Sequence, residues 1–181
     1  MAERKDGWDA EARDDRVVLR CSDMLRDARA FHLAKARWKR FALIRCTVDN
    51  HGPAALTVHA GGSTLVAGGA EYPTEPRDIV IRKCSEFTWD FLAYLILDFG
   101  LVTAVLDIFF LLAGPLTNRR LRKKLAPIAE GDATVAPGGR WEGILAFHKV
   151  PRGKGTVVLR YTPRGEGERT IRTTIEEITA R

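Results

Sequence analysis

The chain has 181 residues, a net charge of +6, a pI near 9.5 and a hydrophobic share of 45%. This length predicts one domain plus an insertion, and this hydrophobic share argues against wholesale disorder. The basic charge indicates an anionic neighbour such as phospholipid, nucleic acid or an acidic protein, with a merely solvated basic surface as the alternative.

Residues 1–15 carry mixed charges with almost nothing to bury, and they predict a disordered N-terminus. They lack the apolar core of a signal peptide, so we expect a protein without a secretory signal. Arg16–Cys21 is rich in valine and predicts a first strand. Apolar residues at near-helical spacing predict a helix over Asp23–Ala36, with a long loop as the alternative.

Phe41–Asp49 predicts a strand, and Asn50-His-Gly-Pro after it is a strong turn signal. Ala55–Ala60 would return as the second arm of a hairpin. Paired glycines then bracket a short strand at Ser63–Ala67, and Asp78–Lys83 alternates in the manner of another strand.

Three strands separated by Gly/Pro turns are predicted near the C-terminus: Trp141–Val150, Thr156–Thr162 and Arg169–Ile178. Together with the earlier strands they indicate an antiparallel sandwich. We therefore divide the chain into a first sandwich part at residues 16–84, an insertion at 85–127 and a second sandwich part at 128–181.

Two segments resemble known proteins. The Asn50-His-Gly-Pro turn after a valine-rich strand is similar to a segment of many immunoglobulin-like bacterial modules. The run from Val135 to Phe147 (VAPGGRWEGILAF) is similar to one in uncharacterised bacterial β-sandwich proteins. The resemblance spans roughly residues 40–180 in two patches. It implies a mainly β chain, an immunoglobulin-like antiparallel β-sandwich with an apolar insertion, and no particular activity.

The insertion is centred on the apolar stretch Phe87–Leu116, which Asp90, Asp98 and Asp107 interrupt. An aspartate in mid-bilayer costs about 2.5–3.5 kcal/mol, so one straight span is disfavoured. If the sandwich parts pair, both ends of the stretch lie on one side of any membrane. We therefore expect a helical hairpin, turning near Gly100.

The arms of this hairpin would be Ser85–Phe99 and Leu101–Ala113, each too short to cross a bilayer core of about 30 Å. The hairpin either dips into a membrane or is buried in a partner protein or a homo-oligomer, because monomers rarely expose large apolar patches. The residues expected to make this contact are Phe91, Leu92, Tyr94, Leu95, Leu101, Val105, Phe109, Phe110 and Leu111.

A basic cluster follows the apolar stretch directly, on a short helix that Asn118 can cap and that stops near Pro127. Cations beside an anionic surface contribute about 1 kcal/mol each. Nucleic acid is a less favoured partner, because the cluster adjoins an apolar segment and has no interleaved aromatic residues. The residues expected to contact the anionic surface are Arg119, Arg120, Arg122, Lys123 and Lys124.

The sequence contains no legible catalytic motif, metal-ligand spacing or cofactor signature. Its three cysteines, an odd number without a CxxC pair, indicate buried thiols rather than a disulfide framework. We expect a non-enzymatic binding or scaffold module at a membrane, on its cytoplasmic face because basic residues flank the apolar stretch. The alternative is a structural subunit whose apolar hairpin is buried in an oligomer.

Overall fold

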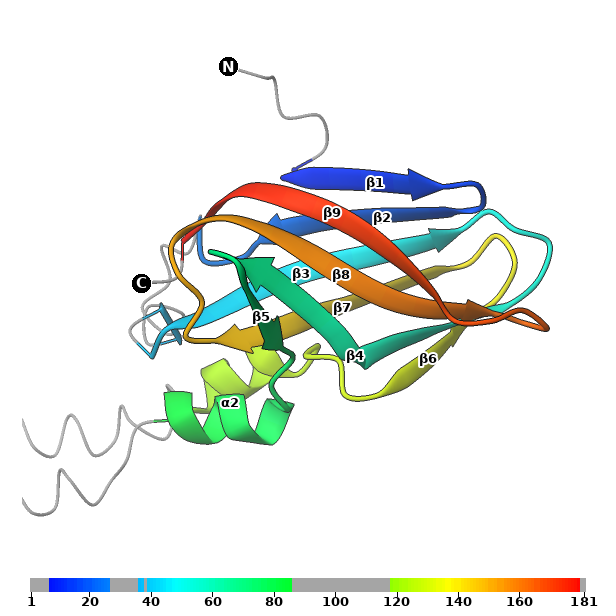
Figure 1. Ribbon diagram of the computed structural model, residues 1–181. Coiled ribbons are helices and arrows are strands. Elements are labelled where there is room, and N and C mark those ends of the chain that lie inside the picture. Colours follow the sequence, from blue (N-terminus) through cyan, green and yellow to red (C-terminus); the bar gives the residue numbers. More distant parts are fainter. Residues whose placement is uncertain (1–6, 27–35, 38, 86–117, 180–181) are drawn as a thin grey trace, which may run out of the picture.

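Two antiparallel sheets lie face to face in the computed structural model, which describes residues 7–26, 36–37, 39–85 and 118–179 (Figure 1). Sheet A has the order β1 (Ala10–Asp14), β2 (Val17–Asp23), β3 (Phe41–Asn50) and β7 (Arg140–His148). Sheet B has the order β5 (Ala70–Pro73), β4 (Leu56–Ala67), β8 (Gly153–Pro163) and β9 (Arg169–Ile178), and β6 (Asp132–Val135) also pairs with β4. The predicted mainly β fold is confirmed.

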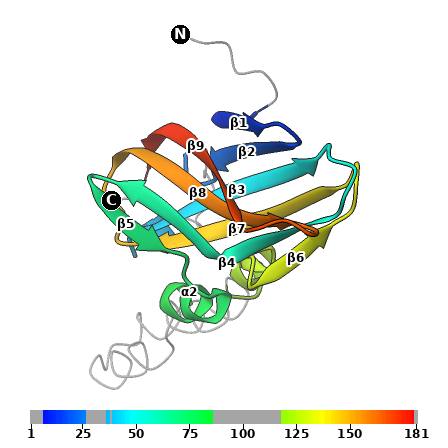
Figure 2. The same ribbon diagram turned by 45° about the vertical axis from the view of Figure 1, so that its right-hand side comes forward.

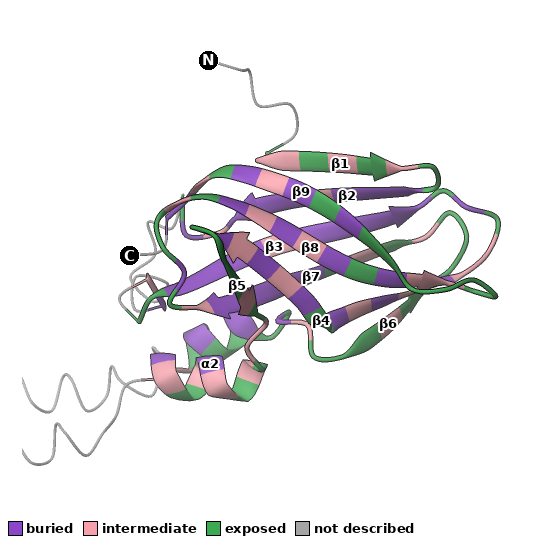
Figure 3. Cartoon of the chain, viewed as in Figure 1, coloured by how far each residue is buried: buried purple, intermediate pink, exposed green. Residues whose placement is uncertain are grey.

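The main core lies between the two sheets. Leu19 and Ile44 of sheet A and Leu65 and Leu159 of sheet B belong to this one cluster, and all four are fully buried. The alternation of buried and more exposed residues along β8 and β9 follows from the period-two geometry of a strand with one face toward this core (Figure 3).

A second core lies on the outer face of sheet A. It is covered by α2 (Arg77–Cys84) and by a helix of residues 118–125, which we call the basic helix (Figure 2). Phe41 and Leu43 of β3 point into this second core, whereas Ala42 and Ile44 point into the main one. Because the first part of β3 is buried on both faces, Phe41–Ile44 is an unbroken apolar run.

Strands on either side of the insertion pair with each other. β3 pairs with β7 from Phe41↔His148 to Asp49↔Arg140, and β4 pairs with β8 in the other sheet. The segments that flank residues 86–117 are therefore parts of one sandwich.

The predicted hairpin of Phe41–Asp49 with Ala55–Ala60 is wrong, because β3 and β4 belong to different sheets. The backbone of Asn50 instead bonds to the turn before β7: the Gly138 N–H donates to the Asn50 carbonyl, and the Asn50 N–H donates to the Gly139 carbonyl. The turn signal was real, but the turn carries the chain from one sheet to the other.

The glycines before Ser63 do not end a strand. β4 runs through them, with a register shift between His59 and Thr64, and the Ser63 hydroxyl donates to the His59 carbonyl at 3.0 Å. β6 pairs with the first half of β4 and β5 with the second. These glycines therefore mark an irregularity inside one long strand, which is a common place for glycine in a sheet.

The strand predicted at Asp78–Lys83 is wrong, and the segment is the helix α2. Val80 and Cys84, four residues apart, face the second core, which is helical rather than strand spacing. Pro76 precedes the first turn, Asp78 lies in it, and basic residues occupy the last turn. This arrangement suits the helix dipole.

The predicted disorder of residues 1–15 is wrong for Ala10–Asp14, which form β1 against β2. The alternation in this segment puts Ala10 and Ala12 against the main core, while Glu11 bonds to Arg20 of the neighbouring strand at 2.7 Å. A cross-strand ion pair of this kind suits an exposed edge strand.

The expectation of separate buried thiols is wrong for Cys21 and Cys46, which form a disulfide between β2 and β3. The two residues are directly opposite in the register, with Cα atoms 4.3 Å apart, and both are fully buried. Cys84 is buried in the second core. Counting cysteines did not reveal the bridge, because only the register of β2 against β3 brings the two together.

Most of the helix predicted at Asp23–Ala36 lies outside the described residues; Asp23 is the last residue of β2, and residues 24–26 form a turn. The apolar arms Ser85–Phe99 and Leu101–Ala113 also lie outside them, apart from Ser85. The remaining predicted strands correspond to observed ones to within a few residues, namely Arg16–Cys21 to β2, Trp141–Val150 to β7, Thr156–Thr162 to β8 and Arg169–Ile178 to β9.

Candidate functional site

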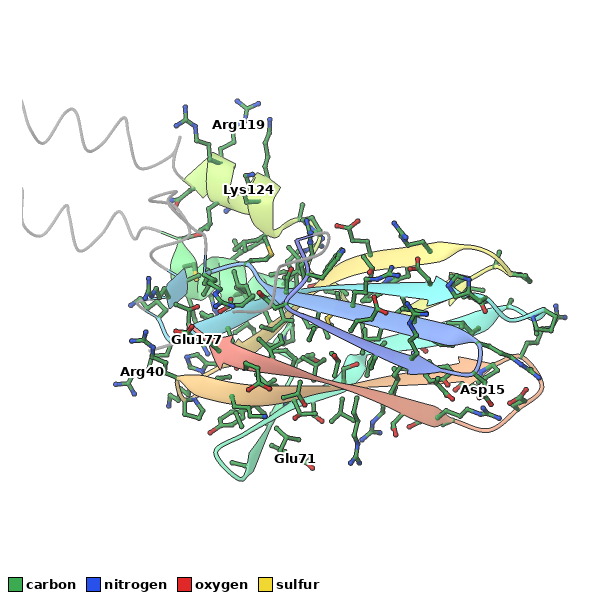
Figure 4. The ribbon with its side chains drawn as sticks, turned by 90° about the horizontal axis from the view of Figure 1, so that it is seen from above. Asp15, Arg40, Glu71, Arg119, Lys124 and Glu177 are labelled. Carbon is green, nitrogen blue, oxygen red and sulfur yellow. A yellow bond between two sulfur atoms is a disulfide. The ribbon has the colours of Figure 1, made fainter. Side chains whose placement is uncertain are left out.

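The basic helix separates an apolar face from a charged one. Leu121 and Leu125, one turn apart, are buried in the second core beside Ile144 of β7. The five predicted cations are all exposed, and Arg119 and Lys124 project away from the sandwich (Figure 4). Among the described residues none of the five forms an ion pair. The exposed set is Arg119, Arg120, Arg122, Lys123 and Lys124.

The start of α2 is tied to the chain just after the basic helix. The Arg77 guanidinium lies 3.0 Å from the Glu130 carboxylate, the Arg77 N–H donates to the same carboxylate at 2.9 Å, and the Arg77 side chain donates to the Ala126 carbonyl at 3.4 Å. The end of α2 lies elsewhere: Lys83 Nζ is 3.3 Å from His148 Nδ1 at the end of β7. The helix therefore points toward the end of the sandwich where β7 stops.

Both ends of the segment 86–117 emerge at that same end of the sandwich. The C-terminal end of the basic helix lies beside the start of α2. Ser85 and Arg122 line one groove between the two helices. The helices therefore run antiparallel, with residues 85 and 118 toward the end formed by Phe41 and His148 (Figures 1 and 2).

The groove between the helices is an open channel of about 630 Å³. Arginines from both helices contribute to its walls together with the apolar Ile81 and one carboxylate. Such a mixture suits the boundary between an anionic and an apolar environment, since arginine stems cover apolar surface while their heads stay polar. Its lining residues are Arg77, Asp78, Ile81, Arg82, Ser85, Arg122 and Ala126.

His148 closes this end of the sheet. Its ring stacks at 4.8 Å from the Phe41 ring and lies 3.7 Å from the Glu75 carboxylate. Burial lowers the pKa of His148 below its usual value, and the nearby Lys83 lowers it further, against the opposing effect of Glu75. A neutral imidazole at pH 7 can accept a hydrogen bond from the Lys83 ammonium through Nδ1.

The opposite end of the sandwich carries a partly buried polar contact. The Tyr161 hydroxyl of β8 donates to the Asp14 carboxylate of β1. Burial, followed by this bond, raises the pKa of Tyr161 to about 12, and the same bond lowers the pKa of Asp14. Arg169 and Glu166 pair beside it at 2.6 Å. A phenol held protonated next to a carboxylate has no nucleophilic character at neutral pH, so we assign it a structural role.

A charged network ties together the strands of sheet A. Asp49 of β3 accepts hydrogen bonds from Arg140 of β7 and from Arg20 of β2, each at 2.5 Å. The Arg140 bond, with a further contribution from Arg20, lowers the pKa of Asp49 despite its burial. Opposite charges on neighbouring strands stabilise the sheet.

The outer face of sheet B forms a shallow hollow of about 610 Å³. Threonine hydroxyls from three neighbouring strands lie beside arginine and glutamate side chains, so the surface is polar and mixed in charge. Its lining residues are Thr64, Val66, Glu71, Thr156, Val158, Arg160, Glu168, Thr170 and Arg172. Sheet A, in contrast, is covered on its outer face by the two helices.

The structure brings together the predicted cations, but the predicted apolar contact residues lie outside the described residues. Those are Phe91, Leu92, Tyr94, Leu95, Leu101, Val105, Phe109, Phe110 and Leu111. Within the described part of the chain, no helix combines the length and apolarity that crossing a bilayer requires. The same residues contain no group of three or more candidate metal ligands, and His59 pairs with Asp132 at 2.9 Å.

No family model and no curated protein matches the sequence. The fold is similar to a candidate lipoprotein from Bacillus subtilis subsp. subtilis str. 168, with a TM-score of 0.45 and 15% identity over 92% of this chain and 38% of that one. It is also similar to a DUF4426 family protein from Pseudomonas aeruginosa PAO1, with a TM-score of 0.41 and 11% identity over 94% and 97% of the two chains. The chain thus spans less than two fifths of the Bacillus protein.

Proposed function

We propose that this chain is a non-enzymatic, membrane-associated binding or scaffold module. An immunoglobulin-like sandwich would be held at an anionic bilayer by the apolar residues of Phe87–Leu116 and by the basic helix. The observation that carries the proposal is the placement of five exposed, unpaired cations beside the two points where the chain enters and leaves that apolar stretch. An apolar segment flanked by cations suits a surface of anionic lipid, where each cation contributes about 1 kcal/mol.

The strand pairing supports the immunoglobulin-like part of the proposal. If β2, β3, β4, β7, β8 and β9 are lettered A, B, C, E, F and G, the sheets read A-B-E and C-F-G. This order follows that of the immunoglobulin sandwich, which supports the proposal. This chain departs from antibody domains in its disulfide, which joins neighbouring strands of one sheet instead of the two sheets. In this arrangement of the strands, the outer face of sheet B would be the surface for a partner protein.

Two features bear on the cellular compartment, and they favour different compartments. Basic residues on both sides of the apolar stretch favour the cytoplasmic face, which we propose. The Cys21–Cys46 disulfide is typical of oxidising compartments. Trapping thiols in intact cells with a membrane-permeant maleimide decides between them, because three labelled cysteines indicate a reducing compartment. A single labelled cysteine overturns the cytoplasmic placement.

The function is tested by flotation of the full-length protein with vesicles of phosphatidylcholine alone or with 30% phosphatidylserine. We expect flotation with the anionic vesicles that falls as salt is raised. Neutralising three helix cations (Arg119→Gln, Arg122→Gln, Lys123→Gln) should weaken it about 100-fold at low salt. The matched control neutralises three exposed arginines at the other end of the sandwich (Arg13→Gln, Arg16→Gln, Arg164→Gln) and should float like the wild type.

The alternative is a structural subunit whose apolar stretch is buried in a homo- or hetero-oligomer. It predicts a sharp oligomer without detergent and no flotation with either vesicle. A soluble monomer in plain buffer that ignores anionic vesicles would contradict both functions.

A further inference from the structure

One end of the sandwich is formed by the β2–β3 and β7–β8 connections. They meet where Phe41 pairs with His148, and the Lys149 N–H donates to the Arg40 carbonyl at 2.7 Å. The β4–β5 turn lies at the same end, because Ala67 pairs with Gly155 at the start of β8. This is also the end toward which α2 points and at which residues 85 and 118 emerge.

The described residues of the β2–β3, β4–β5 and β7–β8 connections include cations and no acidic residue, whereas the connections at the opposite end are mixed in charge. Carboxylates of other elements, Glu75 before α2 and Glu177 of β9, lie at the same end as these cations (Figure 4). In Figure 4, Arg40 lies at the end from which the basic helix projects, and Asp15 lies at the other. The cations at the first end are Arg26, Arg37, Lys39, Arg40, Lys149 and Arg152. The charged residues in the connections at the opposite end are Asp15, Arg16, Arg164, Glu166 and Glu168.

Two of these cations are partly neutralised, since Arg26 and Arg152 lie 3.4 and 3.5 Å from the Glu177 carboxylate. Lys39, Arg40 and Lys149 are exposed and form no ion pair within the described part of the chain. We call these three residues the basic end.

The backbone at the basic end is strained. Arg40 has φ of 59° and Lys149 has φ of 60°, and these are the only non-glycine residues with positive φ among those the structure describes. Glycine or asparagine is the ordinary choice for this left-handed conformation, because a Cβ atom crowds the following carbonyl oxygen and only the short polar side chain of asparagine offsets this by local hydrogen bonding. The chain places cations at both positions instead. Backbone strain that a glycine would relieve often occurs at functional sites.

We propose that the basic end makes a second contact with the same anionic bilayer that the basic helix contacts. This inference rests on the proposed function and adds an orientation to it: the strands stand away from the surface, with the β2–β3 and β7–β8 connections against the lipid headgroups and the β8–β9 connection far from them. The three cations of the basic end lie at the end of the sandwich toward which residues 85 and 118 are directed, and they would meet the headgroups together with the five on the helix.

The test compares full-length variants in partition assays with vesicles containing 30% phosphatidylserine. The basic-end variant carries Lys39→Gln, Arg40→Gly and Lys149→Gly. Because each cation near such a surface strengthens binding about fivefold, we expect binding to weaken about 100-fold at low salt. Its midpoint of thermal unfolding should be unchanged or higher, since glycine relieves the left-handed strain. A second variant with asparagine at positions 40 and 149, which also tolerates this conformation, guards against an effect of glycine alone.

The control variant with Arg13→Gln, Arg16→Gln and Arg164→Gln removes the same charge from the opposite end and should bind like the wild type. If the basic-end variants bind like the wild type while the helix variant does not, this inference is overturned and the proposed function stands. If the wild type itself does not bind anionic vesicles, the proposed function fails and this inference fails with it.

Orientation gives an independent readout. A fluorophore attached through Pro151→Cys, at the basic end, should be quenched by headgroup-labelled lipid, whereas one attached through Glu166→Cys, in the β8–β9 connection, should not. Both positions are exposed, and Cys84→Ser removes competition for the label. Equal quenching at the two positions would overturn the upright orientation.

Discussion

Asn50 and Val135 lie 85 residues apart in the chain, and the side-chain amide of Asn50 donates to the Val135 carbonyl at 3.2 Å. The same amide reaches the carbonyls of Ala136 at 3.1 Å and Ala54 at 2.9 Å, while its oxygen accepts from the Gly52 N–H at 3.0 Å. The two segments with family resemblance, one before the insertion and one after it, therefore meet at a single buried side chain.

Replacing Asn50 by alanine should lower the free energy of unfolding by about 2–4 kcal/mol, because buried carbonyl groups lose their donor. Urea denaturation measures the change. His51→Ala is the matched control: the neighbouring side chain is exposed, and we expect a change within about 0.5 kcal/mol. A loss for Asn50→Ala no larger than that of the control would show that the amide does not hold the two segments together.

Reduction of the Cys21–Cys46 disulfide should destabilise the sandwich. The bridge closes a loop with a sequence separation of 25, for which the chain-entropy model gives about 3–4 kcal/mol. Urea denaturation with and without a phosphine reductant measures this loss, and Cys84→Ala should leave it unchanged. Maleimide labelling of the oxidised, denatured protein should modify one cysteine of the three. Labelling of all three would contradict the bridge.

Acid should weaken the fold through Asp49. Hydrogen bonds from Arg140 and then Arg20 lower the pKa of Asp49 in the folded state below its unfolded value. Such a carboxylate contributes stability that is fully present above its unfolded pKa, near 4, and is lost as the pH falls through the lower folded pKa. Denaturation at pH 6 and pH 3 should therefore show a smaller acid loss for Asp49→Asn than for the wild type. Glu168→Gln, an exposed control in the β8–β9 connection, should lose as much as the wild type.

Individual strands could be predicted well from the sequence where the hydrophobic alternation and the turn residues that bound it indicate the same element. β9 occupies the predicted Arg169–Ile178, because alternating residues are bounded by Gly/Pro turns on one side. Asp78–Lys83 misled because alternation over six residues also fits a helix, and only the burial of Val80 and Cys84 on one face distinguishes the two. Short apolar runs carry this ambiguity in general.

Long-range relationships could not be predicted in the same way. The Cys21–Cys46 bridge depends on a register, and the crossing from β3 to β4 depends on which sheet each strand joins. The same distinction between local and long-range features applies to the cations of the candidate site. The five helix cations lie within residues 119–124 and were predicted from charge alone, whereas Arg40 and Lys149 come together only through the pairing of β3 with β7.

The placement of the basic helix depends on its buried leucines. Leu125 is fully buried in the second core, so Leu125→Ala should lower the free energy of unfolding by about 2–5 kcal/mol through lost burial and a residual cavity. The adjacent Lys124→Ala removes a side chain of similar length that is exposed, and it should change the free energy of unfolding by less than about 0.5 kcal/mol. The two variants should behave in the opposite way toward anionic vesicles at a temperature where both remain folded, with only Lys124→Ala weakening the binding. If Leu125→Ala leaves the stability unchanged, the helix is not packed against sheet A, and its cations are not held in a fixed position relative to the sandwich.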